Sequence, residues 1–266
     1  MNPHTDPSPA PAPATVFLVG AGPGDPELLT RKALRCIRAA TVLLVDDLVS
    51  DACLRYARRS CRVVPVGKRG GCRSTPQAFI ERLMIHEANR GEQVVRLKGG
   101  DPMIFGRVGE EISALRAAGL QVEVVPGITA ASASAAVAGV SLTDRRHAPG
   151  VAFVTGHRQS PAQTQAWAAL VRTGLTLAVY MGVAEAQSIR ASLLDGGMPA
   201  TTPVLMVQAA TTPHERRVRV DLDTLCAPLA DGRIAAPCAI LIGGIAADAQ
   251  PTVDSGALAA AAQIAA

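Results

Sequence analysis

The sequence predicts an α/β fold made of two domains with mostly parallel sheets. Short runs of Val, Leu and Ile, which are typical of buried strands, alternate along the chain with longer segments that suit helices. This repetition indicates a mostly parallel sheet, because a crossover helix must connect two parallel strands. Of the 266 residues, 48% are hydrophobic and only 3% are aromatic, so the cores must consist of Val, Leu, Ile and Ala.

The first domain is expected over residues 15–142. Its strands are predicted at 16–19, 41–45, 63–64, 94–97 and 122–125. Its helices are predicted at 28–39, 50–58, 76–88, 109–118 and 129–138. Ser50 is a suitable N-terminal cap, and Gly91 and Gly119 end the helices that precede them. The last helix is rich in Ala and Ser, whose small side chains allow close packing against another backbone or a flat ligand.

The second domain is expected over residues 143–248, after a polar stretch near 141–150. Its strands are predicted at 151–155, 176–180, 203–208 and 238–242, and its helices at 161–172 and 184–194. Residues 1–14 are rich in Pro, Ala, Ser and Thr, and residues 249–266 are largely Ala and polar residues. Both ends are therefore expected to be loose tails outside the two domains.

The functional interpretation is built around residues 94–109. A buried strand is broken there by Gly99 and Gly100, and Asp101-Pro102 makes a turn before a new helix. Glycines let another group approach the backbone closely, and ligands of open α/β sheets bind at the C-terminal ends of strands. Asp101 can also simply cap the next helix, with Pro102 in its first turn, so a structural turn is the alternative.

A glycine-rich loop at 20–26 follows the first strand. Its glycines stand at 20, 22 and 24 and are interrupted by Pro23, so the loop does not match the G-x-G-x-x-G dinucleotide fingerprint. Pro23 also lacks the N–H donor that a phosphate-binding loop would use. We interpret the segment as a loop for a cofactor without phosphate, with a plain strand-to-helix turn as the alternative.

Polar or polarisable residues gather where the predicted strands end: Asp46, Lys68, Asp101, Thr129 and Met181. Asp46 and Asp47 are adjacent at one strand end, and their side chains are expected to point to opposite faces. Lys68 and Arg69 lie in the glycine-bracketed turn 67–71. That turn is either an exposed basic turn or a binding element for an anionic substrate.

The composition argues against several classes of function. A net charge of +4 with scattered Arg and few aromatic residues is not the pattern of a nucleic-acid-binding protein. Arg does suit a substrate with several carboxylates. The six cysteines lack the spacing of a zinc or redox site, so no metal is expected. Without a run of about eighteen apolar residues or an apolar signal segment, we expect a cytoplasmic protein that does not enter a membrane.

Several of these segments together resemble the tetrapyrrole methylase family. The matching pieces are Val19-Gly-Ala-Gly-Pro-Gly-Asp-Pro26, Val45-Asp46, Gly67-Lys-Arg-Gly70, Arg96-Leu-Lys-Gly-Gly-Asp-Pro102, Phe105-Gly-Arg107, Val125-Pro-Gly-Ile-Thr-Ala130 and Thr155-Gly-His157. Any single piece would be a weak signal. In this order and at this spacing, from about Val16 to about Gly244, they form a specific one.

The resemblance implies two α/β domains with a cofactor cleft between them. It implies transfer of methyl groups from S-adenosyl-L-methionine, which leaves as S-adenosyl-L-homocysteine, to rings A and B of uroporphyrinogen III. The product would be precorrin-2, on the route to sirohaem and cobalamin. An electron-rich pyrrole carbon needs little activation, so the protein must mainly align the reactants and then accept a proton. The resemblance also suggests a homodimer.

The resemblance also implies roles for individual residues. The cofactor-binding set is Pro23, Gly99, Gly100, Asp101, Ile104, Thr129, Ala130, Met181, Ala209 and Ala210. Asp46 corresponds to the family's proton acceptor and Lys68 to its proton donor, and no metal ligand is implied. Candidates for binding the carboxylates of the substrate are Arg69, Arg107 and Arg145.

Three positions depart from the family pattern. Met103 stands where an aromatic residue is common and Val108 where Gly is common, which we interpret as packing changes. Asp144 replaces a common His and puts an anion near the proposed substrate cleft. Two alternatives stay open. One is another methylase of the same fold, acting on a later corrin ring, ribosomal RNA or a protein. The other is a non-catalytic nucleotide-binding α/β protein.

Overall fold

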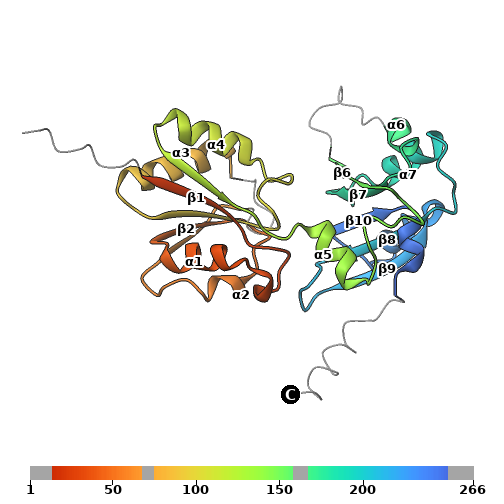
Figure 1. Cartoon of the computed structure of the whole chain (residues 1–266), viewed down its shortest axis with the longest axis horizontal. Coiled ribbons are helices and arrows are strands. Elements are labelled where there is room, and N and C mark those ends of the chain that lie inside the picture. The colour runs from red at the N-terminus through yellow and green to blue at the C-terminus, as the bar shows by residue number, and fades with distance from the viewer. Residues whose placement is uncertain (1–13, 68–74, 158–166, 251–266) are drawn as a thin grey trace, which may run out of the picture. The chain divides into compact units, whose positions relative to one another are not determined.

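The computed structural model of the chain describes residues 14–67, 75–157 and 167–250 (Figure 1). The chain divides into two compact units. The first holds the chain up to Gly20 and residues 30–127, and the second holds residues 21–29 and the chain from Ile128 onward. The predicted tails lie outside the described residues, except for Ala14, Ala249 and Gln250.

The first unit contains a five-stranded sheet in the order β3-β2-β4-β1-β5, and every neighbouring pair within it is parallel. Its strands are β1 (Thr15–Gly20), β2 (Val42–Val45), β3 (Arg62–Pro65), β4 (Val94–Lys98) and β5 (Gln121–Val125). Its helices are α1 (Arg31–Ala39), α2 (Asp51–Leu54), α3 (Gln77–Asn89) and α4 (Val108–Ala117). Figure 1 shows α1 and α2 on one face of the sheet and α3 and α4 on the other. With both faces covered, β2 and β4 are buried along their whole length.

Side-chain caps determine where two helices of this unit begin. The Thr30 hydroxyl accepts a hydrogen bond from the backbone N–H of Ala33, so α1 begins at Arg31. The residues before it form a separate 3₁₀ helix, η1 (Pro26–Leu28), which belongs to the second unit. The helix predicted at 28–39 therefore begins too early.

Helix α2 begins where the sequence predicts but is shorter. The Ser50 hydroxyl caps it by accepting a hydrogen bond from the N–H of Ala52. The helix ends at Leu54 instead of residue 58, because the chain then turns, with the N–H of Ala57 bonded to the carbonyl of Leu54. The predicted cap is confirmed and the predicted length is wrong.

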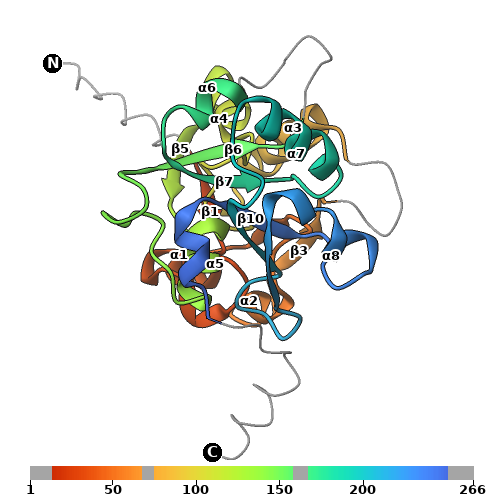
Figure 2. The ribbon, with the colours of Figure 1, turned by 90° about the vertical axis from the view of Figure 1, so that its right-hand side faces the viewer.

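The second unit contains a mixed five-stranded sheet in the order β6-β7-β10-β8-β9, whose strands are all labelled in Figure 1. Figure 2 labels β6, β7 and β10 of this sheet from another side. Its strands are β6 (Val151–Thr155), β7 (Thr176–Tyr180), β8 (Pro203–Gln208), β9 (Arg216–Asp221) and β10 (Cys238–Ile242). Its helices are α5 (Ala130–Val137), α6 (Trp167–Val171), α7 (Ala186–Asp195) and α8 (Ala227–Ala230), with 3₁₀ helices η2 (Leu222–Thr224) and η3 (Gly244–Asp248). Within the described residues, no helix has the length and apolar character needed to cross a membrane.

Pairing in the second sheet differs from that in the first. Only β6 and β7 pair in parallel, while β10 is antiparallel to both β7 and β8, and β9 is antiparallel to β8. Over the two described sheets, five of the eight strand pairs are parallel, which confirms the predicted fold class. Strand β9 was not predicted, because three arginines obscure the strand pattern in an edge strand that is only partly buried.

The division between the units falls before α5, whereas the sequence placed the domain boundary at residue 142/143. Ala131, Ala133 and Ala135 of α5 are buried in a cluster with Leu205 of β8 and Leu241 of β10. The helix therefore belongs with the second sheet by packing. The strand–helix alternation before it gives no sign of this change of partner.

An ion pair with one buried partner connects β3 to α3 in the first unit. Arg62 donates from Nη1 to Oε1 of Glu87 at 3.0 Å, and its Nη2 pairs with Oε2. The Glu87 side chain is almost fully buried, while that of Arg62 is half exposed. These hydrogen bonds from Arg62 hold the pKa of Glu87 below its usual value, against the opposing effect of burial.

We expect this pair to make stability depend on pH. A depressed pKa means that Glu87 stabilises the fold above the unfolded-state pKa of about 4.3, and that the contribution is lost as the pH falls through the lower folded-state value. Glu87→Gln should therefore lower the free energy of unfolding at pH 7, and the deficit should shrink below about pH 4. Urea denaturation at several pH values measures this. A deficit that is the same at every pH would contradict the assignment.

Candidate functional site

The C-terminal ends of the parallel strands in the first unit carry several of the predicted site residues. Asp46 follows β2, and Gly99, Gly100 and Asp101 follow β4. The N–H of Asp46 donates to the carbonyl of Leu97, so these two strand ends are held side by side. Ligands of open α/β sheets bind at this kind of edge.

Four charged side chains, Asp46, Arg96, Lys98 and Glu111, form a connected group below this edge, which we call the buried charge cluster. Arg96 donates from Nη2 to Oδ1 of Asp46 at 2.8 Å and from Nε to Oε1 of Glu111 at 3.2 Å. Lys98 Nζ lies 3.1 Å from the same Oε1 of Glu111 and 3.8 Å from Oδ2 of Asp46. Two cations thus meet two anions, and each cation contacts both carboxylates.

The cluster is exposed to solvent at one member. The Asp46 side chain is 33% exposed, while those of Arg96, Lys98 and Glu111 are 4% exposed or less. Burial lowers the pKa of the Lys98 ammonium, as does the neighbouring Arg96 charge, although Glu111 and Asp46 oppose both effects. Asp46 is therefore the carboxylate that a ligand at the strand ends can meet.

Asp46 and Asp47 face different surroundings, as the strand pattern predicts. Asp46 turns to Arg96, whereas an added Cβ on Gly67 would lie 2.0 Å from Oδ1 of Asp47. The Asp47 carboxylate therefore occupies the space beside Gly67, and glycine is needed there. The two adjacent carboxylates do not act as a pair.

Glycines allow three neighbouring strand ends to touch through their backbones. A Cβ on Gly20, at the end of β1, would lie 2.7 Å from both the carbonyl oxygen of Gly100 and the nitrogen of Gly127. A Cβ on Gly127, after β5, would lie 2.3 Å from the same oxygen. Asp101 Oδ2 accepts a hydrogen bond from the N–H of Gly127 at 3.1 Å, which closes the arrangement.

One expectation for the loop after β4 needs correction, and one gains a structural reason. An added Cβ on Gly99 would lie 2.8 Å from Cβ of Leu48, so the chain itself also requires glycine there. Asp101 does not cap a helix, since its Oδ1 accepts from the N–H of Met103 in a turn and α4 begins only at Val108. The structural alternative therefore explains part of this segment, while the positive φ of Gly100 (66°) and the exposed edge stay compatible with ligand binding.

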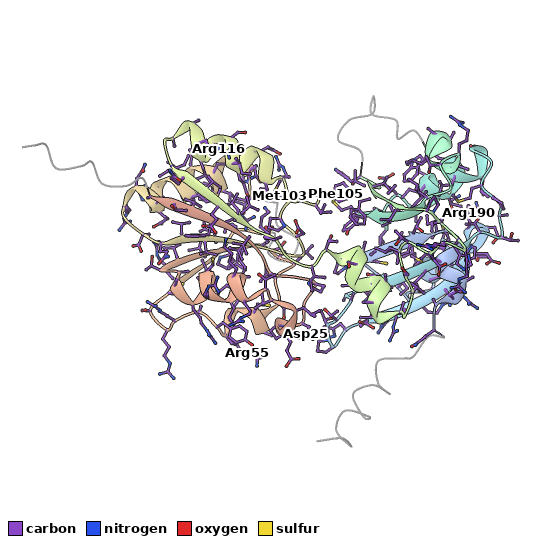
Figure 3. All side chains as sticks on the ribbon, in the orientation of Figure 1. Asp25, Arg55, Met103, Phe105, Arg116 and Arg190 are labelled. Carbon is purple, nitrogen blue, oxygen red and sulfur yellow. The ribbon has the colours of Figure 1, made fainter. Side chains whose placement is uncertain are left out.

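The departures Met103 and Val108 have different surroundings. Val108 is buried in the core cluster of the first unit, so a packing change is confirmed there. Met103 is 60% exposed and Phe105 is 39% exposed. Figure 3 labels both in the loop between β4 and α4. Core packing does not explain Met103, and the two side chains give this loop an apolar surface.

The predicted cofactor residues of the second unit lie at strand and helix ends. The Thr129 hydroxyl lies 2.6 Å from the Tyr180 hydroxyl, which also accepts from the N–H of Ala131 at 3.0 Å, so Tyr180 fixes the start of α5. Met181 and Ala209 both adopt left-handed backbone conformations, with φ of 54° and 45°. Such strain in residues other than glycine is concentrated at functional sites.

The loop at 21–29 packs within the second unit. An added Cβ on Gly24 would lie 2.4 Å from Cγ2 of Thr212, and the N–H of Asp25 donates to the Thr211 hydroxyl at 3.2 Å. Pro23, just before Gly24 in sequence, is half-buried, as is Ala209, and Ala210 is buried. Pro23 and Ala210 thus belong to the same compact unit although they are far apart in the sequence.

The candidate substrate-binding arginines differ in how far they are already paired. Lys68 and Arg69 lie outside the described residues. Arg107 is exposed and forms two hydrogen bonds to Glu110, at 2.9 and 2.7 Å. Arg145 is exposed, whereas the next residue, Arg146, pairs with Asp144.

Asp144 does not present a lone negative charge. Both of its oxygens accept hydrogen bonds from Arg146, which hold the pKa of Asp144 well below its usual range. Arg146 Nη2 also lies 2.9 Å from Oδ2 of Asp248. The substitution of Asp for the common His is therefore compensated locally.

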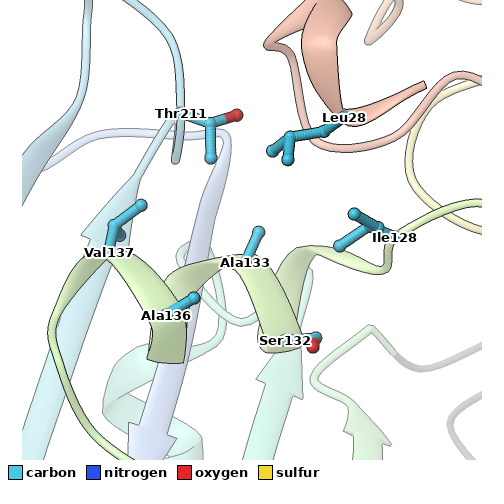
Figure 4. Close-up of a pocket in the computed structure, with 7 residues that line it drawn as sticks. All are labelled: Leu28, Ile128, Ser132, Ala133, Ala136, Val137 and Thr211. Atoms are coloured by element: carbon cyan, nitrogen blue, oxygen red, sulfur yellow. The ribbon is translucent and has the colours of Figure 1, made fainter.

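A cavity of about 430 Å³ lies along α5 in the second unit (Figure 4). Its lining residues are Leu28, Ile128, Ser132, Ala133, Ala136, Val137 and Thr211. Small side chains of α5 form much of this lining. None of the predicted cofactor residues is among the lining residues.

Sequence reasoning assigned no role to Arg96 and Lys98 and did not find Glu111 or the contacts of Tyr180. A signal for the first two was present: charged residues in a central strand that is buried on both faces need buried partners. Glu111 shares α4 with Glu110 and Arg116, and nothing in the sequence distinguishes it from them. Its partners become visible only in the folded structure. Among the described residues, no group of three or more His, Cys, Asp or Glu side chains could hold a metal ion.

The fold and these strand ends define an α/β protein whose first sheet carries a positioned carboxylate at the C-terminal ends of its strands. The chain belongs to the tetrapyrrole (corrin/porphyrin) methylases, whose family profile matches residues 15–226.

Individual proteins of this family are closely similar to the chain. A uroporphyrinogen-III C-methyltransferase of Pseudomonas aeruginosa is 50% identical over 233 residues, which cover 88% of this chain and 94% of that protein. A crystal structure of uroporphyrin-III C-methyltransferase from Thermus thermophilus, complexed with S-adenosyl homocysteine, is 41% identical with a TM-score of 0.73, covering 87% of this chain and 98% of that one. A siroheme synthase of Azotobacter vinelandii is 46% identical over 230 residues, which cover 86% of this chain and 50% of that longer protein.

The contact of strand ends predicts opposite effects for two glycines of the first unit. Gly20→Ala should lower the free energy of unfolding by about 1–3 kcal/mol, because the added Cβ meets three backbone atoms of Gly100 and Gly127. Gly109→Ala, in the first turn of α4, meets nothing within 4 Å and should raise it by about 0.5–1 kcal/mol. Urea denaturation of both variants tests this. Equal effects would show that the strand ends do not pack as described.

Proposed function

We propose that the chain is an S-adenosyl-L-methionine-dependent enzyme that methylates carbons of uroporphyrinogen III on rings A and B, giving precorrin-2. The observation that carries the proposal is the 50% identity to a uroporphyrinogen-III C-methyltransferase, which extends over 88% of this chain. The carboxylate of Asp46, at a strand-end edge and paired to a buried arginine, supports it. The siroheme synthases among the relatives are consistent with the same stage of tetrapyrrole synthesis.

The residues proposed to bind the cofactor occur in both units. Gly99, Gly100, Asp101 and Ile104 lie in the first unit. Pro23, Thr129, Ala130, Met181, Ala209 and Ala210 lie in the second. They are largely uncharged, which fits a cofactor without phosphate. Gly100, Met181 and Ala209 have left-handed backbone conformations, so their N–H and carbonyl groups point in directions that a regular strand does not allow.

The proposed mechanism requires little acid–base chemistry from the protein. When bound, the cofactor supplies a methyl group activated by a positive sulfur, and after the methyl group has been attached to the pyrrole carbon a proton must leave the macrocycle. We assign the uptake of that proton to the Asp46 carboxylate, because Arg96 holds this carboxylate in place at an exposed edge. Lys68 is assigned as the proton donor, by its family position.

The substrate carries several carboxylates, and three arginines are proposed to bind them: Arg69, Arg107 and Arg145. The exposed guanidinium of Arg145 is the one that the structure supports best, since Arg146 is taken up by two carboxylates. Arg107 would have to exchange or share its contact with Glu110. We also expect a homodimer, by family resemblance, and a cytoplasmic location; both stay predictions.

Initial rates with defined acceptors test the proposal. The protein should transfer labelled methyl groups from S-adenosyl-L-methionine to uroporphyrinogen III and not to ribosomal RNA or to a protein acceptor. Efficient transfer to one of those acceptors instead would favour another methylase of this fold. Binding of ATP or NAD without affinity for S-adenosyl-L-methionine would favour a non-catalytic nucleotide-binding protein.

Substitution of the two adjacent aspartates tests the proton acceptor. Asp46→Asn keeps the shape of the side chain but cannot accept the proton, so turnover should fall by roughly 10²–10⁴-fold while S-adenosyl-L-methionine affinity is kept. Asp47→Asn is the matched control, because Asp47 lies beside Gly67 and away from Arg96. Steady-state rates and calorimetry measure both. Loss of turnover in Asp47→Asn with normal turnover in Asp46→Asn would overturn the assignment.

A pair of glycines tests cofactor binding at the end of β4. Gly100→Leu should abolish S-adenosyl-L-methionine binding in calorimetry, because a side chain would cover the backbone that the cofactor approaches. Gly119→Leu carries the same cost of a left-handed backbone, with φ of 75° against 66°, at a helix end where an added Cβ meets nothing within 4 Å. It should bind normally. Unchanged affinity in folded Gly100→Leu would refute the role of Gly100.

A further inference from the structure

The buried charge cluster has three members that a substrate at the strand ends cannot meet directly. Arg96, Lys98 and Glu111 are 4% exposed or less, and each is linked to Asp46 directly or through one contact. Any effect they have on the reaction must pass through Asp46. Such an arrangement is costly to bury for stability alone, since apolar residues of similar volume often serve the fold as well.

We propose that Arg96, Lys98 and Glu111 are positioning residues that fix the orientation of the Asp46 carboxylate and set its basicity through a balance of charge. The proposal rests on the proposed function in one respect, that Asp46 accepts the proton. It extends that function by assigning a purpose to three buried residues around the acceptor.

Orientation comes from Arg96. Its Nη2 holds Oδ1 of Asp46 at 2.8 Å, and its Nη1 donates to the carbonyls of Leu44 at 3.3 Å and Leu97 at 3.4 Å. The guanidinium is therefore bonded to the backbone of the two strands whose ends carry the site. An arginine held on several sides keeps its partner carboxylate in one position.

Charge balance comes from Glu111. Its Oε1 accepts from Arg96, from Lys98 and from the amide of Gln77, while its fully buried Oε2 has no hydrogen-bond partner among the described residues. A carboxylate oxygen buried in this way is costly for the fold, so we assign Glu111 a purpose in the site. It compensates the second cation, Lys98, which would otherwise weaken Asp46 as a base.

Other charged groups lie near the cluster. Glu110 of α4 acts on Lys98 from a distance, and Arg107, just before α4, is paired with Glu110. Asp47 lies beside Gly67, and Lys68 lies outside the described residues. Among the described residues, the ion pairs within 4 Å of the Asp46 carboxylate are those with Arg96 and Lys98 of β4.

Removing one charge at a time predicts shifts of opposite sign. Lys98→Met removes a cation beside Asp46. The ionised form of Asp46 then becomes less favourable relative to the protonated form, so the pKa of Asp46 should rise. Glu111→Gln removes the compensating anion, so two cations act on Asp46 and its pKa should fall. Each shift should be about one pH unit or more, as expected for charges at this separation. The double variant Lys98→Met/Glu111→Gln should return the pKa of Asp46 toward its original value.

Carbon-13 NMR of the aspartate carboxyls measures these shifts without any substrate. The full chain is labelled at aspartate, and Asp46 is assigned by comparison with Asp46→Asn. Glu87→Gln is the control, since it removes another buried glutamate that is paired with an arginine. Its partner Arg62 lies beside Val42, at the end of β2 opposite to Asp46. Circular dichroism shows whether each variant is folded. If Glu111→Gln is not folded, Lys98→Met and the double variant still test the proposal.

The pH dependence of turnover provides the second measurement. Since activity requires the ionised carboxylate, the acidic limb of kcat/KM should move to higher pH in Lys98→Met and to lower pH in Glu111→Gln, and should not move in Glu87→Gln. Shifts of one sign, or lower rates with the acidic limb unmoved, would overturn the proposal and leave the cluster a structural role. Opposite NMR shifts in a protein that does not methylate uroporphyrinogen III would support the charge balance and refute the proposed function.

Discussion

The hydrogen bonds and ion pairs of Arg96, in the middle of β4, are the interactions on which the strand ends of the first unit depend. A guanidinium cannot be buried in a parallel sheet without partners, and Arg96 finds them in Asp46, Glu111 and the carbonyls of two strands. Each partner is thereby fixed relative to the sheet. The carboxylate after β2, the helix α4 and the end of β4 take positions that follow from satisfying one buried cation.

Around this charged centre, the strand ends are shaped by the absence of side chains. Gly20, Gly100 and Gly127 let the backbones of β1, β4 and β5 touch, and Asp101 joins two of these segments through a hydrogen bond to Gly127. Gly99 and Gly67 leave room for Leu48 and Asp47. The glycines of the family motifs therefore have structural reasons within this chain in addition to any contact with the cofactor.

Much of the fold could be predicted from the sequence because buried strands leave a clear local pattern. The strand at 176–180 coincides with β7, and that at 203–208 with β8. Strand β9 escaped because an edge strand with three arginines has no such pattern. The antiparallel pairing of β10 and the attachment of α5 to the second sheet are tertiary choices that local sequence does not contain.

The site was predictable to the extent that motifs carry it. The opposite surroundings of Asp46 and Asp47 follow from strand geometry, and the structure agrees. Glu111 could not be found, because its role comes from meeting Arg96 and Lys98 across the packing of α4 on the sheet. For a related reason the sequence indicates that something approaches Gly99, but not that one such neighbour is Leu48 of the same chain.

The measurement that tests the account most directly is carbon-13 NMR of the tetrapyrrole formed from methyl-labelled S-adenosyl-L-methionine and uroporphyrinogen III. The account predicts two labelled methyl groups, each bonded to a ring carbon, one on ring A and one on ring B. A label on nitrogen or on a carboxylate oxygen, a label on other rings, or a tetrapyrrole without label would contradict it.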